Sequence, residues 1–111
     1  MEELIDPIVL FLKVLADSTR LKIIELLKNT EMTANDIELK LNKSQSTTSQ
    51  QLSKLIAADI LQVRREGVKK FYSIKHPEIF TVLSSVNSYI SSRDKEKIED
   101  IASKDIIDTL H

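Results

Sequence analysis

Apolar residues recur every three or four positions through the first half of the chain, and this spacing predicts a series of amphipathic helices. Small polar residues fall where such helices begin: Asp17 or Ser18, then Thr33, then Ser44 are natural N-caps. Asp36 stands three residues after Thr33, where a capping box places an acid. The predicted helices cover residues 2–15, 18–28, 33–41 and 44–58.

The period changes at Ile60, where "ILQVRRE" and "KKFYSIK" form two short runs typical of strands. Gly67, the single glycine, lies between them, and a tight turn usually needs one residue at positive φ. These runs predict a two-stranded hairpin with Gly67 at its tip. Pro77 then opens a fifth helix, and residues 94–110 have the pattern of a last amphipathic helix.

Four helices, a hairpin and a fifth helix in this order predict a mainly α fold with a small β-hairpin, a winged helix-turn-helix. At 111 residues the chain is long enough for one modest core. We expect residues 1–92 to form the DNA-binding and dimerisation domain and residues 93–111 to add a C-terminal helix. The apolar stripes of the first and last helices are left over by the central core. Either a second copy of the chain or the chain's own core covers them.

Composition excludes several classes of protein. The chain has no Cys, which rules out disulfides, thiolate metal sites and thiol redox sensing. Nothing resembles a signal peptide, and no apolar run approaches the roughly 18 residues of a membrane span. We therefore expect a cytoplasmic protein without a membrane partner.

The net charge of −1 is unevenly distributed along the chain. Residues 39–75 contain eight basic and two acidic side chains, a net charge of +6, so the remainder carries −7. A basic middle flanked by acidic ends suggests a surface for a polyanion. Chance clustering on a solvated face explains the charge alone equally well.

The fourth predicted helix, within "SQSTTSQQLSKL", has no carboxylate. At 100° per residue, Thr48, Leu52 and Leu55 share the core face. The opposite face offers amides and hydroxyls that suit base edges in the major groove, since glutamine pairs with adenine. Hydroxyl-rich helix surfaces also occur without any partner. The residues predicted to read bases are Gln45, Ser46, Ser49 and Gln50.

Four cations bracket the hairpin tip at Gly67, next along the chain from this acid-free helix. Such a tip can follow phosphates or enter a narrow minor groove. The helix and the hairpin together favour double-stranded DNA as the partner. The residues predicted to hold phosphates are Lys43, Ser44, Thr47, Ser53, Lys54, Arg64, Arg65, Lys69 and Lys70. Because the reading face lacks arginine, the commonest guanine contact, we expect an A·T-leaning site.

Three stretches in this order, "LKVLADSTRLKIIELL", "LNKSQSTTSQQLSKL" and "LQVRREGVKKFYSIK", resemble the ArsR family of winged-helix repressors. The resemblance covers roughly residues 4–92. It implies a homodimer, paired through the first and fifth helices, that binds an imperfect inverted repeat and blocks transcription. It also places the four predicted base-reading residues where the family contacts bases. The implied dimer residues are Leu4, Ile5, Ile8, Leu12, Val82, Val86, Tyr89 and Ile90.

The departures from the family concern its sensors. Many relatives bind metals through Cys in the third helix, where this chain reads "DIELKLN". Others use paired ligands on the fifth helix. His76 and Glu78 match one such pair, but Tyr89 and Ser92 replace the other. With only one of the two ligand pairs present, we expect no bound metal and no cofactor, and the sequence does not identify the effector ligand.

Other functions have weaker support. An enzyme is not expected, because the sequence shows no Cys nucleophile, His cluster, Gly-rich phosphate loop or G-x-S-x-G motif. A winged helix for protein contacts would expose apolar residues, and only Val68 and Phe71 qualify on the hairpin. A non-specific chromosomal DNA-binding protein is the other alternative. A sequence-specific, homodimeric repressor is the favoured interpretation.

Overall fold

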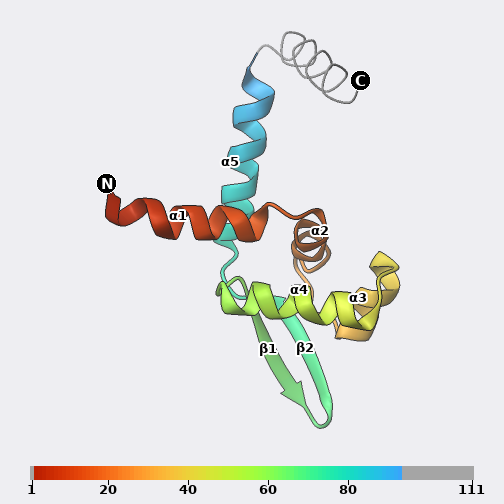
Figure 1. The fold of residues 1–111 in the computed structure, drawn as a ribbon. Helices are drawn as coiled ribbons and strands as arrows, with labels where there is room; N and C mark the ends of the chain where they lie inside the picture. The colour runs from red at the N-terminus through yellow and green to blue at the C-terminus, as the bar shows by residue number, and fades with distance from the viewer. Residues whose placement is uncertain (1, 94–111) are drawn as a thin grey trace, which may run out of the picture. The chain divides into compact units, whose positions relative to one another are not determined.

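A computed structural model describes residues 2–93, and in this range the chain forms five helices and one antiparallel pair of strands (Figure 1). The predicted winged helix-turn-helix order is confirmed. The predicted helix over residues 94–110, and with it the proposed C-terminal extension, lies outside the described residues. The elements are α1 (Glu2–Leu15), α2 (Ser18–Leu26), α3 (Ala34–Leu41), α4 (Gln45–Ala57), β1 (Leu61–Glu66), β2 (Lys69–Ile74) and α5 (Glu78–Ser92).

The chain divides into two compact units, residues 1–76 and residues from Pro77 onward. The first unit contains α1 to α4 and the hairpin, and α5 lies in the second.

Side-chain caps fix where three helices of the first unit begin. Asp17 accepts a hydrogen bond from the backbone N–H of Arg20, Thr33 from that of Asp36, and Ser44 from a third N–H. Each cap satisfies one of the backbone donors that a helix start leaves unpaired. The three caps predicted from the sequence are therefore confirmed, with Asp17 rather than Ser18 capping α2.

Left-handed residues end the same three helices. Asn29, Asn42 and Asp59 have φ values of 62°, 54° and 62°, and each stands within three residues of the end of α2, α3 or α4. Asn and Asp tolerate this conformation better than other side chains apart from glycine. A chain with one glycine thus makes its sharp turns with Asn and Asp, including the turn at Asn42 between α3 and α4.

The core of the first unit is aliphatic and is built from α2, α3 and α4. Ile23 and Ile24 of α2, Ile37 of α3 and Leu55 of α4 have no exposed surface. α2 packs against both α3 and α4, and α3 packs against α4. This packing fixes the angle at which α4 presents its opposite face to solvent.

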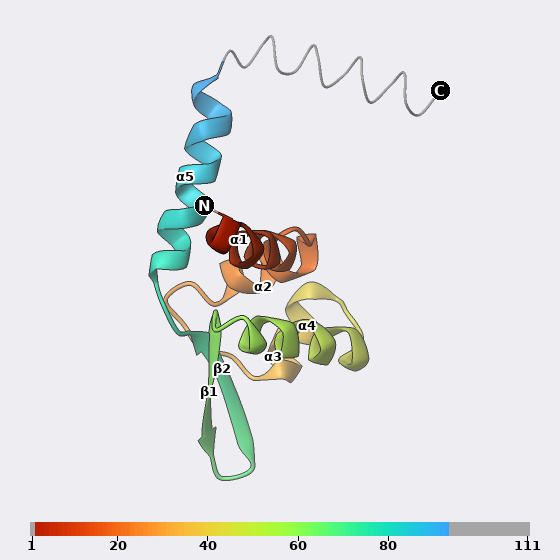
Figure 2. The ribbon, with the colours of Figure 1, turned by 60° about the vertical axis from the view of Figure 1, so that its left-hand side comes forward.

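The hairpin follows the C-terminal end of α4 and projects away from the helices of the first unit (Figures 1 and 2). Gly67 has a φ of 62° and occupies the first of two turn residues, as in a type II′ turn, so the predicted tip is confirmed. Met32, in the segment before α3, forms an isolated bridge with Tyr72 of β2. The two residues exchange backbone hydrogen bonds of 3.0 and 2.8 Å. The hairpin is thereby anchored to the helix-turn-helix.

Thr48 provides a test of this packing. Its hydroxyl is buried on the core face of α4 and has no hydrogen-bond partner among the described residues. Replacing it by the methyl of valine removes a desolvated polar group, so Thr48→Val should raise the unfolding free energy by about 1 kcal/mol. Denaturant unfolding measures the change.

Thr47→Val is the control, because the Thr47 hydroxyl accepts a hydrogen bond from Ser44 at 2.9 Å. That variant should be neutral or less stable. A loss of stability in Thr48→Val would show that the hydroxyl is hydrogen-bonded in solution.

Candidate nucleic-acid interface

The exposed face of α4 gathers the four residues predicted to read bases. Gln45, Ser46, Ser49 and Gln50 are all exposed and, together with Ser53, line one groove of about 420 Å³. Thr48, Leu52 and Leu55 are buried on the opposite face, as the helical spacing predicts. Burial of these three residues therefore turns the polar face of α4 toward solvent.

This face is neutral and has both hydrogen-bond donors and acceptors. Two amides and three hydroxyls line the groove, and α4 contains no acidic residue. Amides and hydroxyls match the donor and acceptor pattern of base edges, and the lack of carboxylates removes repulsion from phosphates. The chemistry suits a duplex groove.

The N-terminus of α4 is ordered by its own side chains. The Ser44 hydroxyl accepts from the Thr47 backbone N–H at 3.0 Å and donates to the Thr47 hydroxyl at 2.9 Å. Lys43, also predicted to hold a phosphate, is exposed directly before this cap. A helix N-terminus favours anions, so these residues stand where a phosphate would be stabilised.

The register of the hairpin separates its four cations into two kinds. Arg65 of β1 lies directly opposite Lys70 of β2. Both are exposed, and neither forms an ion pair within the described part of the chain. Like charges directly opposite on a sheet destabilise each other. This pair is therefore a site where an anion would relieve repulsion.

Arg64 is held by other protein groups. Its guanidinium pairs with Glu31 and, at 2.8 Å, with Glu66, and it stacks over the Phe71 ring at 4.6 Å. The hydrogen bond from Arg64 holds the pKa of Glu31 below its usual value, and Glu31 raises the pKa of Arg64. Arg64 ties the hairpin to the segment before α3. It would have to leave two carboxylates to meet the phosphate predicted for it.

Two further predicted phosphate residues are placed differently from the reading face. Lys69 lies opposite Glu66 at the hairpin tip. Lys54 lines a separate groove, shared by α1 and the C-terminal end of α4. Lys54 also stands one helical turn after Gln50, so it borders the face of the four residues predicted to read bases.

Sequence reasoning missed Arg20, a buried cation of α2 that is only 8% exposed. Its guanidinium donates to the carbonyls of Val14 and Lys13 at the end of α1, and to the Gln51 side chain of α4 at 2.6 Å. Asp17 lies 3.9 Å away. The backbone N–H of Arg20 also holds the pKa of Asp17 below its usual value. The spacing Asp17-x-x-Arg20 was the available signal, but it does not reveal burial.

Of the two positions that match a metal pair of the family, His76 interacts with a carboxylate of its own chain. His76 lies 3.1 Å from Asp59, which also accepts from Lys75. Hydrogen bonds from Lys75 first and His76 second hold the pKa of Asp59 below its usual value. Within residues 2–93, no three metal-ligating side chains come together.

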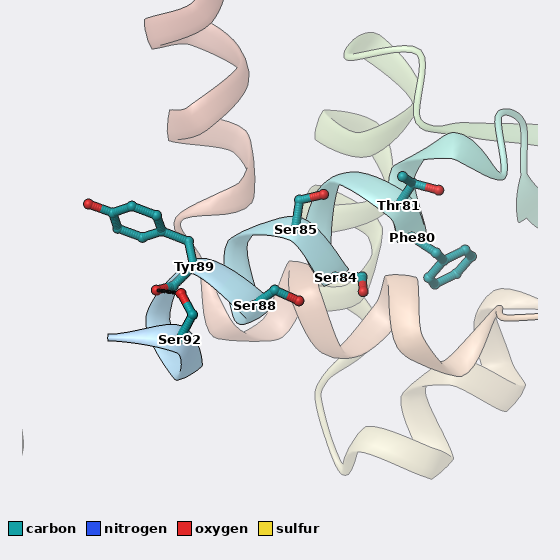
Figure 3. Close-up of a pocket in the computed structure, with 7 residues that line it drawn as sticks. All are labelled: Phe80, Thr81, Ser84, Ser85, Ser88, Tyr89 and Ser92. Carbon is teal, nitrogen blue, oxygen red and sulfur yellow. Dashed lines mark hydrogen bonds between the residues drawn. The ribbon is translucent and has the colours of Figure 1, made fainter. Parts of the chain in front are cut away.

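The apolar stripes of α1 and α5 are exposed in the single chain. On α1, Leu4 and Leu12 are 60% and 53% exposed; on α5, Val86 and Tyr89 are 49% and 65% exposed. Serines follow the other side of α5 and line a groove of about 600 Å³ with Phe80 (Figure 3). None of the helices described in residues 2–93 is long and apolar enough to cross a membrane.

The comparisons with known proteins agree with this geometry. A family described as bacterial regulatory protein, arsR family, matches residues 17–63. The transcriptional repressor SdpR of Bacillus subtilis is 31% identical over 84 residues, which cover 76% of this chain and 93% of SdpR. The arsenical resistance operon repressor of Staphylococcus aureus is 29% identical over 94 residues, which cover 85% of this chain and 90% of that repressor.

Solved structures share the whole described fold. NolR from Sinorhizobium fredii superposes with a TM-score of 0.73 at 31% identity, covering 80% of this chain and 88% of NolR. The homodimeric winged helix-turn-helix DNA-binding domain of Mb0332 from Mycobacterium bovis has a TM-score of 0.73 at 25% identity. The match covers 84% of this chain and 86% of that domain.

The fold and the exposed face of α4 define a winged helix-turn-helix DNA-binding protein of the transcriptional-regulator class. The chain belongs to the ArsR family of bacterial regulatory proteins.

Arg20 generates a prediction for the scaffold of this interface. Arg20→Met removes a charged donor from two carbonyls and an amide, so the unfolding free energy should fall by about 1.5–3 kcal/mol. Denaturant unfolding, together with amide exchange in α4, measures the effect. Lys22→Met on the same helix, where the side chain is exposed, should change stability by less than about 0.5 kcal/mol. Equal effects of the two variants would contradict a structural role for the Arg20 network.

Proposed function

We propose that this protein is a homodimeric transcriptional repressor that binds an A·T-leaning inverted repeat in double-stranded DNA. The observation that carries the proposal is the acid-free Ser and Gln face of α4 on the same compact unit as Arg65 and Lys70, two cations without an ion pair among residues 2–93. One surface reads base edges and the other holds phosphates. The protein acts by binding rather than catalysis, in the cytoplasm with its DNA target.

Base reading falls to Gln45, Ser46, Ser49 and Gln50, which share one exposed face. A glutamine amide can donate to N7 and accept from N6 of one adenine, whereas guanine is best read by an arginine fork. The absence of arginine from α4 supports the A·T preference.

Phosphate binding falls to three groups of residues. Arg65 and Lys70 lack a counter-ion in the described chain, Lys43 and the Ser44 cap precede the N-terminus of α4, and Ser53 borders the reading face. Backbone contacts of this kind set the register of the helix in the groove. Arg64 serves to position the wing through Glu31, and its contact with DNA is secondary.

Dimerisation is supported by the exposed apolar stripes and by the homodimeric state of the Mycobacterium bovis domain. A second copy would cover four residues of α1 and four of α5, which a lone chain leaves in water. Two-fold symmetry of the protein then predicts half-sites about one helical turn apart. The eight residues are Leu4, Ile5, Ile8, Leu12, Val82, Val86, Tyr89 and Ile90.

The base-reading role is tested with Gln50→Ala. Loss of a paired contact to one base should cost about 1–3 kcal/mol on the selected site and relax specificity at one position. Competition binding against a set of single-base variants of the site measures this. Asn87→Ala on α5 removes an exposed amide outside the reading face and should change nothing. Uniform weakening on all sequences by Gln50→Ala would refute base reading by this residue.

The wing is tested with Arg65→Ala combined with Lys70→Ala. Each lost phosphate contact should lower the slope of log K against log salt by about 0.9, on every DNA sequence. The matched control combines Lys22→Ala on α2 with Lys28→Ala in the turn that follows α2, which changes the net charge equally. A slope equal to that of the wild type would remove the wing from the phosphate contacts.

The dimer is tested with Val86→Glu, which places a charge in the α5 stripe. Burying an unpaired carboxylate is costly, so the variant should be monomeric at micromolar concentration and lose most of its DNA affinity. Sedimentation measures the mass. Leu39→Glu on α3, at a leucine that is 74% exposed and outside both stripes, should remain dimeric. A dimeric Val86→Glu protein would show that α5 lies outside the interface.

A further inference from the structure

A groove of about 610 Å³ lies in the first compact unit, between α1 and the C-terminal end of α4. Its apolar lining includes Leu10, Phe11 and Val14 of α1 and Ala57 of α4. Leu10 is 64% exposed, although it belongs to the most apolar helix of the chain. The volume falls within the range of small-molecule sites, roughly 300–1,000 Å³.

Every charged residue that lines this groove is a cation. Lys13 and Lys54 stand at its border, and neither forms an ion pair within residues 2–93. Arg20 adds positive charge, but its donors are already used by α1 carbonyls and Gln51. Asp17 pairs with Arg20 at 3.9 Å and is also attracted by Lys54, but it forms no ion pair with Lys54. An apolar floor with two available ammonium groups matches a molecule with an apolar body and an anionic head.

The groove and the proposed dimer stripe lie on adjoining sides of α1. Taking Leu4 as zero and roughly 100° per residue, the stripe spans about 0–100°. On the same scale Leu10 and Val14 fall at roughly 240–280°, whereas Phe11, at roughly 340°, adjoins the stripe at Leu4. A second copy seated on the stripe would therefore leave the Leu10 and Val14 side of the groove accessible.

We propose that this groove binds an amphipathic organic anion, such as a medium-chain carboxylate, and that the bound ligand weakens DNA binding. Binding itself is independent of the proposed function, and only its effect on DNA rests on it. The carboxylate of the ligand pairs with Lys13 and Lys54, and the alkyl chain of the ligand covers Leu10, Phe11 and Ala57. Lys54, predicted to hold a phosphate, is then occupied by the ligand. Any shift at α1 also reaches Gln51 of α4 through Arg20.

Binding is tested by titrating the full-length protein, without DNA, with decanoate and with its uncharged amide, decanamide, while amide shifts are recorded by NMR. Decanoate should give saturable shifts that are largest at residues 7–14 and 54–58, with smaller shifts at Arg20 and Gln51, and decanamide should bind about fivefold more weakly because it lacks the charge. The absence of saturable shifts there, or equal affinity for the two ligands, would overturn the proposal.

Variants separate the groove from general hydrophobic binding. Lys13→Gln with Lys54→Gln should weaken decanoate about five- to tenfold and leave decanamide unchanged. Lys22→Gln with Lys40→Gln removes the same charge elsewhere and should have no effect. Ala57→Phe should fill the groove and weaken both ligands. A groove closed by a second copy would show concentration-dependent shifts without ligand at residues 54–58, which lie outside the proposed dimer stripe, and this result would also overturn the proposal.

The effect on DNA is measured separately, as operator affinity with and without decanoate. Reciprocal weakening of decanoate by operator DNA should have the same factor, because the coupling is a shared free energy. Decanoate binding without any DNA binding would refute the repressor and leave the groove site intact. Both bindings without mutual effect would refute the regulatory role of the ligand.

Discussion

The guanidinium of Arg20 joins three helices through one buried set of hydrogen bonds. From α2, the guanidinium donates hydrogen bonds to the carbonyls of Lys13 and Val14 at the end of α1 and to the side chain of Gln51 on α4. A buried cation is tolerated only when its donors are satisfied, so this network requires the three helices in one arrangement. Gln51 lies directly after Gln50 in α4, and the orientation of the face proposed to read bases therefore depends on a buried residue of α2.

The hairpin of β1 and β2, the wing of the fold, is also held by contacts between residues distant in the sequence. Met32 and Glu31, adjacent in the segment before α3, hold the hairpin through the Tyr72 backbone and through Arg64. Arg64 is engaged in this attachment, while Arg65 and Lys70 lie opposite each other without a counter-ion among residues 2–93. The hairpin thus has a structural cation on one face and, on the other, the two cations proposed to bind phosphate. Charge counts along the chain do not distinguish the two uses, whereas strand register does.

Much of the fold follows from local sequence rules. The caps at Thr33 and Ser44, the turn at Gly67 and the buried side of α4 depend on spacing alone, and the structure has them as predicted. Contacts between distant residues were beyond such rules. Arg20 with Gln51, and Glu31 with Arg64, are separated by 31 and 33 positions, and nothing in their neighbourhoods reveals the pairing. Spacing likewise places Lys54 at the edge of the polar face of α4, but it does not reveal the groove that Lys54 lines together with α1.

The central claim is that two copies of the α4 face read a symmetric DNA site, and selection of binding sites from random duplex DNA at two salt concentrations tests it most directly. We predict an enriched A·T-leaning inverted repeat with half-sites about one helical turn apart, bound less tightly at the higher salt concentration. Salt-sensitive binding without any enriched sequence would contradict base reading by Gln45, Ser46, Ser49 and Gln50. The absence of binding at either salt concentration would contradict the proposed role in DNA binding altogether.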